Sequence, residues 1–376
     1  MNSEPHIVIV AGEDSGDFHG ANLAAALRRQ LPQIRLSGIG GQKMKKNGVE
    51  LIFPSARLAV VGIAEVVSRL PDILAGCRAI RKHLRESRPD LLVLIDFPDF
   101  NLHLVAPYAR RLKIPIVYYI SPQVWAWRQG RVESINKLVE KILVILPFEE
   151  EFYRRRGVAV EYVGHPLLDE FKSFHCKPRN EKPYIALIPG SRSGEIKRLL
   201  PLMLTAARLY SREQPNTRFL IPVAPSIAIE FVKKMIPASL NDKVTLLRQP
   251  LSQALQKVSF ALVTSGTATL ETALAEVPMV VIYRVNELSY QLGKRLISVP
   301  HISLVNLIAE KEIVPELIQG DTHPEKIAAK MRTLFDNSEN YIKICLELKA
   351  LKKRLGKAGA PQRAADAIIT VLRGNE

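Results

Sequence analysis

The chain has 376 residues, which is enough for two domains because single hydrophobic cores stop growing near ~250–300 residues. Its composition, 47% hydrophobic and 24% charged, is that of a globular protein and excludes a disordered or repeat protein. The formal net charge of +16 indicates an anionic partner, such as a nucleic acid, an anionic lipid or a phosphorylated substrate.

The cysteines and the N-terminus indicate the cellular compartment of the protein. Cys77, Cys176 and Cys345 are widely separated and form no CxxC pair, so the sequence predicts neither a disulfide framework nor a zinc cluster. The first residues lack the basic region of a secretory signal, and no stretch approaches the ~18 apolar residues of a spanning helix. We therefore expect a cytosolic protein in a reducing compartment.

In the first half of the chain, predicted strands alternate with predicted helices. Apolar runs indicate strands at 6–11, 91–95, 114–120 and 141–146, and helical spacing indicates helices over 18–31 and 72–88. Continuous apolar strands between helices are typical of a parallel sheet that is covered on both faces.

The same pattern restarts in the second half. The predicted strands there are 184–188, 218–223, 260–264 and 279–283. The polar, basic stretch 172–183 has no periodicity and is interpreted as the interdomain linker. In open α/β sheets ligands bind beyond the carboxyl ends of the strands, so the turns at those ends are the candidate sites.

The first such turn in the second half is 189–196, which leads into a helix through 199–209. Small residues there let backbone N–H groups approach an anion at a helix N-terminus, and Arg192, next to Ser191, offers a fork of donors to phosphate oxygens. The alternative is an ordinary strand-to-helix turn with a surface arginine.

A second turn of this kind, 264–271, contains four hydroxyl residues around Gly266 that can all donate, among them Thr267. Glu271 falls one helical turn after Thr267, where its carboxylate would accept from a ribose diol. A capping box explains part of the same pattern. Two such turns favour a nucleotide diphosphate site, and the missing GxxxxGK[ST] run disfavours a P-loop hydrolase.

The turn 11–20 also follows a strand, but its three acids would repel a diphosphate. Acidic side chains accept well from sugar hydroxyls, so Ser15 and Asp17 are candidate sugar ligands. The alternative is that the acids cap the next helix. His19 and His165 lie at strand-end turns, but no HxxxH or HExxH spacing exists, so we expect no metal site.

The strand at 91–95 ends in two carboxylates, Asp96 and Asp99. A carboxylate at the mouth of a low-dielectric site has a raised pKa and can act as a general base toward a hydroxyl group. An Asx-turn explains one aspartate more easily than both. We expect Asp99 to be the base and Asp96 to be structural, although the sequence does not decide between them.

Both tryptophans, Trp125 and Trp127, lie within three residues of each other in 121–128. Aromatic side chains stack on sugars and line acyl channels, and core or rim packing is the alternative.

Residues 57–76 contain more apolar side chains than one helix face holds, with basic residues close by. The predicted patch consists of Val60, Val61, Ile63, Val66, Val67 and Leu70, with Leu58, Ile73 and Leu74 beside it. An apolar surface ringed by cations can settle on anionic lipid, whereas a buried helix is the alternative.

Taken together, the motifs resemble a known family over essentially the whole chain and in its order. They are GEDSGD at 12–17, IDFPDFN at 95–101, SPQVWAWR at 121–128, PFE at 147–149, GHP at 164–166, PGSRSGEI at 189–196, SGTATLE at 265–271 and PMVVIYR at 278–284. The family is that of the lipid-A-disaccharide synthases. One departure is Val305 before Asn306, where the family has proline.

The resemblance implies a GT-B fold, with two Rossmann-like parallel-sheet lobes and a cleft between them. The first lobe, 1–171, would bind the acceptor and face the membrane, and a last helix near 357–376 would pack back on it. The second lobe, 172–356, would bind the UDP-sugar. The implied reaction transfers 2,3-diacylglucosamine from its UDP derivative to 2,3-diacylglucosamine 1-phosphate, giving a β-1,6 disaccharide and UDP with inversion.

The resemblance also implies the site. Asp99 would be the base, Asn306 and Arg192 would join it in catalysis, and Glu271 and Arg284 would be on the UDP side. No metal and no cofactor are expected. The protein would be peripheral on the cytoplasmic face of the inner membrane. Family members include dimers, so a homodimer is possible, and acyl-chain length is left open.

Two alternatives use the same features differently. A sugar-nucleotide 2-epimerase, or a GT-B transferase for soluble sugars, shares the diphosphate turns but needs no apolar patch. A nucleic-acid-binding protein is supported by the charge alone.

Overall fold

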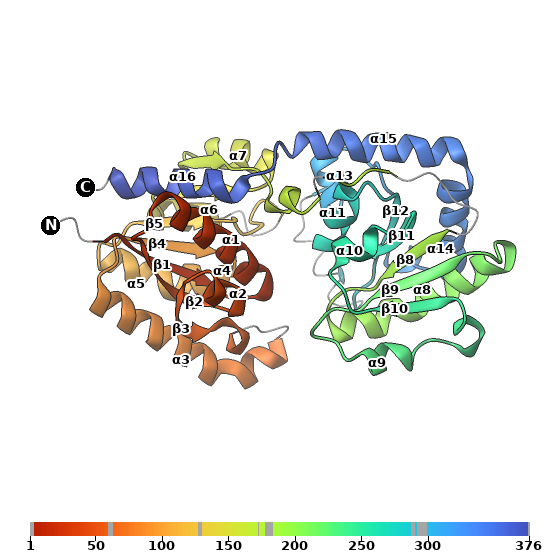
Figure 1. The fold of residues 1–376 in the computed structure, drawn as a ribbon, viewed down its shortest axis with the longest axis horizontal. Coiled ribbons are helices and arrows are strands. Elements are labelled where there is room, and N and C mark those ends of the chain that lie inside the picture. Colours follow the sequence, from red (N-terminus) through yellow and green to blue (C-terminus); the bar gives the residue numbers. More distant parts are fainter. Residues whose placement is uncertain are drawn as a thin grey trace. The chain divides into compact units, whose positions relative to one another are not determined.

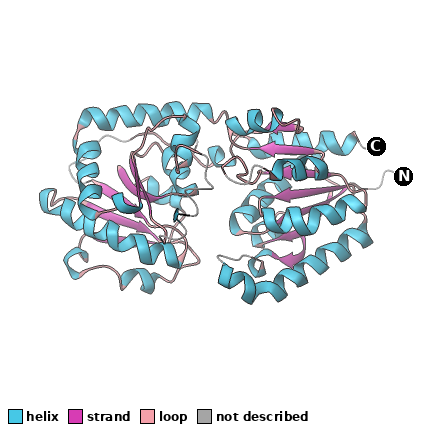
Figure 2. Ribbon diagram, turned by 180° about the vertical axis from the view of Figure 1, so that it is seen from behind, coloured by secondary structure: helices cyan, strands magenta, loops and turns pink. Residues whose placement is uncertain are grey.

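The computed structural model describes residues 4–58, 63–126, 130–171, 173–176, 183–286, 290–291 and 299–374, without the side chains of Asp14 and residues 63–69. The chain forms two compact units, of which unit 1 comprises Met1–Pro166 with Lys357–Glu376 and unit 2 comprises Leu167–Gly356. Each unit is a parallel sheet between helices (Figures 1 and 2).

Unit 1 contains a seven-stranded parallel sheet in the order β3-β2-β1-β4-β5-β6-β7. The strands are β1 (His6–Ala11), β2 (Arg35–Gly40), β3 (Glu50–Pro54), β4 (Leu91–Ile95), β5 (Ile116–Tyr119), β6 (Lys141–Val144) and β7 (Val160–Tyr162). The helices are α1 (Asp14–Gln30), α2 (Gln42–Lys46), α3 (Ile63–Ser87), α4 (Pro98–Phe100), α5 (Ala106–Arg111), α6 (Arg131–Leu138), α7 (Pro147–Arg154) and α16 (Ala360–Arg373).

Both faces of this sheet are buried, which is why β4 is apolar at every position and β1 is apolar after His6. Ile7 and Ile9 belong to the cluster that contains α1 and α16, whereas Val8 and Val10 belong to the cluster that contains α3 and α5. The last helix of the chain is therefore part of the core of unit 1 (Figure 1). Its Arg363 Nε donates to the carbonyl of Val163 over 2.8 Å.

Unit 2 contains a six-stranded parallel sheet in the order β10-β9-β8-β11-β12-β13. Its strands are β8 (Tyr184–Ile188), β9 (Arg218–Pro222), β10 (Val244–Leu247), β11 (Phe260–Thr264), β12 (Met279–Tyr283) and β13 (Glu316–Ile318). Its helices are α8 (Ser193–Glu213), α9 (Ile229–Lys233), α10 (Leu251–Leu255), α11 (Thr267–Leu274), α13 (Leu304–Ala309), α14 (Pro324–Met331) and α15 (Ser338–Arg354). This strand order repeats that of the first six strands of unit 1.

The prediction of two Rossmann-like parallel sheets is confirmed, and all eight predicted strands are present. Several further strands were not predicted, namely β2, β3, β7, β10 and β13. Within the part of the chain that is described, no helix is both long and apolar enough to cross a membrane.

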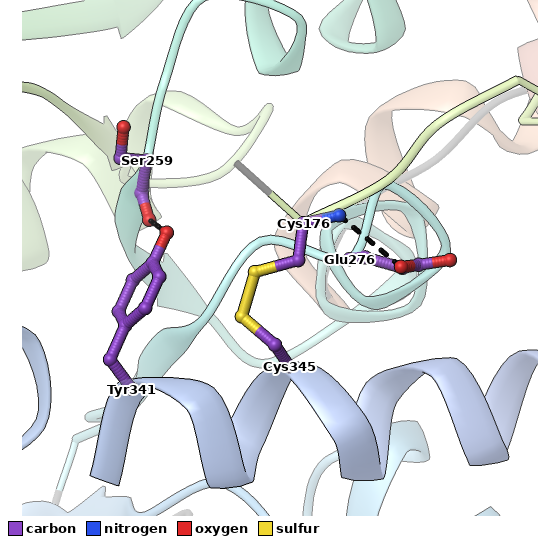
Figure 3. Close-up of a disulfide and its surroundings, with 5 residues drawn as sticks. All are labelled: Cys176, Ser259, Glu276, Tyr341 and Cys345. Carbon is purple, nitrogen blue, oxygen red and sulfur yellow. Dashed lines mark hydrogen bonds between the residues drawn. A yellow bond between two sulfur atoms is a disulfide. The ribbon is translucent and has the colours of Figure 1, made fainter. Parts of the chain in front are cut away.

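The cysteine prediction was wrong in one respect. Cys176 and Cys345 form a disulfide across 169 residues of sequence, with 5.8 Å between their Cα atoms (Figure 3). The backbone N–H of Cys176 also donates to Glu276, and the hydroxyl of Tyr341 on α15 donates to the carbonyl of Ser259. No sequence pattern indicates this pair, because only the fold brings the two positions together. Cys77 is a buried free thiol.

Candidate functional site

The predicted turns lie where the strand order of each sheet reverses. In unit 1 this switch point is between the neighbouring strands β1 and β4, and in unit 2 it is between β8 and β11. Ligands of open α/β sheets bind outside the carboxyl ends of the strands at such points. The four turns that follow these strands, at 12–17, 96–101, 189–195 and 264–271, are therefore two pairs, one in each unit.

The turn after β4 has an unusual backbone. Asp96 and Phe97 have φ values of +45° and +53°, which L-residues seldom adopt. The carbonyl of Asp96 accepts from the Tyr118 hydroxyl over 2.6 Å and from Asn101 Nδ2 over 2.7 Å. These partly buried hydrogen bonds hold the left-handed turn in place, and such backbone conformations are common at functional sites.

The turns after β1 and β4 are packed directly against each other. A Cβ atom on Gly12 would lie only 2.2 Å from the ring of Phe97, so no larger residue fits without a shift. Gly12 thus allows the two turns of unit 1 to approach.

Asp96 and Asp99 have opposite surroundings. Burial, and secondarily the charge of Glu13, raise the pKa of Asp96 to about 6. Asp99 is exposed on α4, and its carboxylate pairs with Arg131 over 2.6 Å and lies 3.9 Å from His103 Nε2. The raised pKa that was expected for the base is therefore found on Asp96.

Asp17 does not have the surroundings of a sugar ligand. It is buried, and its carboxylate accepts from the backbone N–H groups of Gly41, Lys43 and Met44 at the start of α2, over 2.7–3.0 Å. It therefore caps α2, a helix distant in sequence. Ser15 is exposed in the first turn of α1.

Trp125 has a structural role in this fold. Trp125 is buried, its Nε1 donates to Glu149 over 3.0 Å, and its ring packs edge-on against Phe148. Trp127 lies outside the described residues. The packing alternative therefore holds for Trp125.

Glu149 was not singled out as a site residue by the sequence. Its carboxylate also accepts from the N–H groups of Ile145 and Leu146 at the start of α7, and burial raises its pKa to about 7. The only signal was the PFE motif, which does not show that its acid is buried.

In unit 2, the turn after β8 presents its polar groups outward. Gly190 has φ +107°, and Ser191 and Arg192 are exposed at the N-terminus of α8, where Arg192 lies 3.3 Å from Glu195. Unpaired N–H groups at the start of a helix of 21 residues attract an anion.

The turn after β11 is similar but offers fewer hydroxyl groups than expected. Gly266, with φ +152°, and Thr267 are exposed at the start of α11. The hydroxyls of Ser265 and Thr269 donate to the carbonyls of Ile302 and Gly266, so they are already engaged. The expectation that all four hydroxyl residues can donate was wrong.

The surroundings of Glu271 on α11 raise the pKa of its carboxyl group. Burial, and then the charge of Glu170, raise its pKa to about 7. A carboxyl group with this pKa accepts or donates a hydrogen bond near neutral pH. Arg284, just after β12, has an exposed side chain, and its carbonyl accepts from Arg198.

Asn306 has a positioning role in the structure. It is fully buried; its Nδ2 donates to the Val314 carbonyl and to Glu316, and its Oδ1 accepts from the N–H groups of Ile313 and Val314. Both polar atoms of the Asn306 side-chain amide are thus hydrogen-bonded inside the unit, and its catalytic role stays a prediction.

Glu316 is the centre of this buried network and was missed. Besides Asn306, it accepts from the N–H groups of Ile302 and Ser303 and from the Ser303 hydroxyl. The network ties the segment before α13 to β13.

The predicted membrane patch is described only in part. Val60 and Val61 lie outside the described residues, as do the side chains of Ile63, Val66 and Val67. Leu70 is 49% exposed and Leu74 is 42% exposed, whereas Leu58 is buried in the core. Leu58 therefore does not contribute to an exposed surface.

No group of three or more potential metal ligands was found among the residues that the structure describes.

Comparison with solved structures identifies the fold. The chain superimposes on the UDP-bound co-structure of MnaA from S. aureus with a TM-score of 0.67 at 15% identity, covering 98% of this chain and 97% of that one. For a glycosyltransferase of kitacinnamycin the TM-score is 0.65 at 16% identity, with 98% and 99% covered. The fold is the GT-B fold of glycosyltransferases and sugar-nucleotide epimerases.

Sequence comparison gives the family. The lipid-A-disaccharide synthetase profile matches residues 7–367. The chain is 45% identical to the lipid-A-disaccharide synthase of Syntrophus aciditrophicus (strain SB), with 100% of both chains covered. It is 40% identical to that of Myxococcus xanthus (strain DK1622), with 99% of both covered. The chain belongs to the lipid-A-disaccharide synthetase family, a family of glycosyltransferases in lipid A biosynthesis.

Proposed function

We propose that the protein transfers 2,3-diacylglucosamine from its UDP derivative to the 6-hydroxyl of 2,3-diacylglucosamine 1-phosphate. The products are a β-1,6-linked disaccharide 1-phosphate and UDP. The observation that carries this proposal is the family match over residues 7–367. The epimerase alternative shares the fold but not the family.

The UDP moiety is assigned to the switch point of unit 2. Support comes from two exposed helix N-termini, those of α8 and α11, which follow neighbouring strands. Ser191, Arg192, Gly266 and Thr267 present donors there, and Arg284 follows the next strand, β12. These groups would stabilise the leaving diphosphate by backbone dipoles and a guanidinium, without a metal ion or other cofactor.

Inversion at the anomeric carbon needs a base that removes the proton of the attacking hydroxyl from the face opposite the leaving group. We assign this role to Asp99, because its carboxylate is exposed on α4, in the turn after β4, beside the guanidinium of Arg131. Asp96 is the second candidate, because a pKa of about 6 suits a base near neutral pH.

The protein would work as a peripheral protein on the cytoplasmic face of the inner membrane. Both substrates are acylated and anionic, which fits the net charge of +16 and the exposed Leu70 and Leu74 on α3. We extend this surface to the predicted patch at 60–70. A homodimer is compatible with the family.

Product analysis tests the reaction. The purified protein is incubated with UDP-2,3-diacylglucosamine and the monosaccharide 1-phosphate, with and without EDTA, and the lipids are analysed by mass spectrometry and by NMR of the anomeric proton. We expect a β-linked disaccharide in both incubations. UDP release without acceptor, epimerised UDP-sugar, or loss of product with EDTA would contradict the respective part of the proposal.

A further inference from the structure

Large apolar side chains are exposed at few positions of the described chain, and they are not scattered. They are Leu70, Leu74, Tyr184, Ile342 and Leu346. Four of these five form two pairs spaced i, i+4 on a helix, one on α3 of unit 1 and one on α15 of unit 2. Side chains at this spacing lie next to each other on one helix face.

The pair on α15 is strongly exposed. Ile342 is 57% exposed and Leu346 is 62% exposed, while Tyr341, Ile344 and Leu348 on the opposite side of the helix are buried in unit 2. The outer face of α15 is therefore apolar at its centre although the helix is already packed on its inner face.

Lysines flank this apolar pair. Lys343, Lys349 and Lys353 are exposed on α15, and Ala350 continues the line of Ile342 and Leu346 by one more turn. Two acidic residues also lie on this helix: Glu339 is exposed in its first turn, three residues before Ile342, and Glu347 pairs with Lys311 over 2.7 Å. The three lysines outnumber Glu339 on this face. The face thus combines apolar side chains with positive charge.

We propose that this face of α15, defined as Ile342, Leu346, Lys343, Lys349 and Lys353, docks unit 2 onto an anionic lipid surface. The inference rests on the membrane association under Proposed function and adds a second contact, in the lobe assigned to UDP. The apolar pair enters the boundary between headgroups and acyl chains, and the lysines extend their stems toward lipid phosphates.

The charge favours lipid over a second protein chain as the occupant. Two apolar side chains on one helix cover far less than the ~800 Å² per partner of a stable protein interface. A lipid surface requires no complementary shape, and three lysines match its negative charge.

Vesicle binding of the full-length protein tests the proposal. The probe is vesicles of equimolar phosphatidylglycerol and phosphatidylcholine, with pure phosphatidylcholine as the neutral reference. We expect Ile342→Ser with Leu346→Ser, and separately the triple change of Lys343, Lys349 and Lys353 to Gln, each to weaken binding to the anionic vesicles about tenfold or more.

A matched triple variant separates a local site from net charge. Lys233, Lys234 and Lys257 are exposed lysines of unit 2 outside α15, and their change to Gln removes the same charge. We expect a less than about threefold effect from this variant. Equal losses in the two triple variants, or unchanged binding of the Ile342/Leu346 variant, would overturn the proposal. A changed oligomeric state with unchanged vesicle binding would assign the face to a second copy instead.

Two further measurements separate this proposal from the function on which it rests. Leu70→Ser with Leu74→Ser tests the contact of unit 1 alone: if only this variant loses vesicle binding, the α15 site is refuted and membrane association stands. Transferase activity on detergent-dispersed substrates should be unchanged in the α15 variants. An inactive wild-type protein would refute the reaction but not vesicle binding.

Discussion

Asp96 and Asp99 lie three residues apart, yet Asp96 is half-buried in a left-handed turn and Asp99 is exposed beside Arg131. We predict that Asp99→Asn lowers kcat at least ~100-fold, as is typical for loss of a general base, with little change in thermal stability. The measurement is initial rate of disaccharide formation, with the melting temperature as the control for folding.

The pH profile distinguishes the two candidates. If Asp96 is the base, kcat/KM of the wild-type protein falls as the pH drops through about 6, because protonation removes the base. Asp96→Asn would then lose most of the activity, and the fall of kcat/KM at low pH would disappear. Asp99→Asn would keep both the activity and that fall at low pH. That pattern would refute our assignment.

Arg192 offers a planar fork of donors next to the N-terminus of α8. We predict that Arg192→Ala lowers turnover at least ~100-fold, because the charge that develops on the leaving diphosphate loses its guanidinium partner. Arg192→Lys keeps the positive charge but loses the planar fork of donors, so its turnover should lie between those of Arg192→Ala and the wild type. Equal rates for Arg192→Ala and wild type would show that the helix N-termini stabilise the leaving diphosphate without Arg192.

Glu149 links stability to pH. Its pKa is about 7 in the folded protein and near 4.5 when unfolded, so folding favours the protonated form. The contribution of protonated Glu149 to the free energy of unfolding is fully present below pH 4.5 and is lost as the pH rises through about 7. We predict that wild type loses up to roughly 3 kcal/mol over this range relative to Glu149→Gln. Urea unfolding at pH 5 and pH 8 measures this difference; a constant difference would contradict it.

At the scale of elements, the contact between the turns after β1 and β4 constrains the site of unit 1. We predict that Gly12→Ala destabilises unit 1 by about 1–3 kcal/mol, because the new methyl group overlaps the Phe97 ring. It should also lower activity by moving the Asp96 turn. Gly320→Ala, where a Cβ meets nothing within 4 Å, is the control. Chemical denaturation and rates of both variants check this, and equal stability would contradict it.

Elements that were predictable from sequence share one property, burial on both faces. β1, β4, β8, β11 and β12 are continuous apolar runs, and every residue of β4 and β11 is buried. The missed strands lack a continuous apolar run: β7 has three partly buried residues, and β2, although buried at five of its six positions, contains two glycines and Ser37. Their position in the sheet, not their periodicity, makes them strands.

The candidate site was likewise only partly predictable from the sequence. The turns could be found because each directly follows a predictable strand. The functions of individual side chains, in these turns or on α13, could not be found because their partners are set by the fold. Asp17 accepts from backbone N–H groups at α2, and the side-chain amide of Asn306 is bonded to residues 313–316. A motif indicates where a carboxylate or amide lies along the chain but not whether its lone pairs are already engaged.

At the scale of the whole molecule, the chain leaves unit 1 at Pro166 and returns to it at Lys357. The returning helix α16 supplies Ala364, Ile368 and Leu372 to the same core as β1 and β4. Unit 2 is continuous in sequence and has its own core. The two units should therefore differ in their dependence on the C-terminus.

Truncation after Gly356 tests this difference. We predict that the protein ending at Gly356 loses the cooperative unfolding transition of unit 1, because removing α16 exposes an apolar face of the sheet, and the loss of three such buried side chains alone costs several kcal/mol. Residues 167–356 alone should fold and bind UDP in calorimetry. Truncation after Gly374 should leave both transitions unchanged. A folded unit 1 without α16, seen as wild-type hydrogen-exchange protection of β1 and β4, would show that the helix is dispensable.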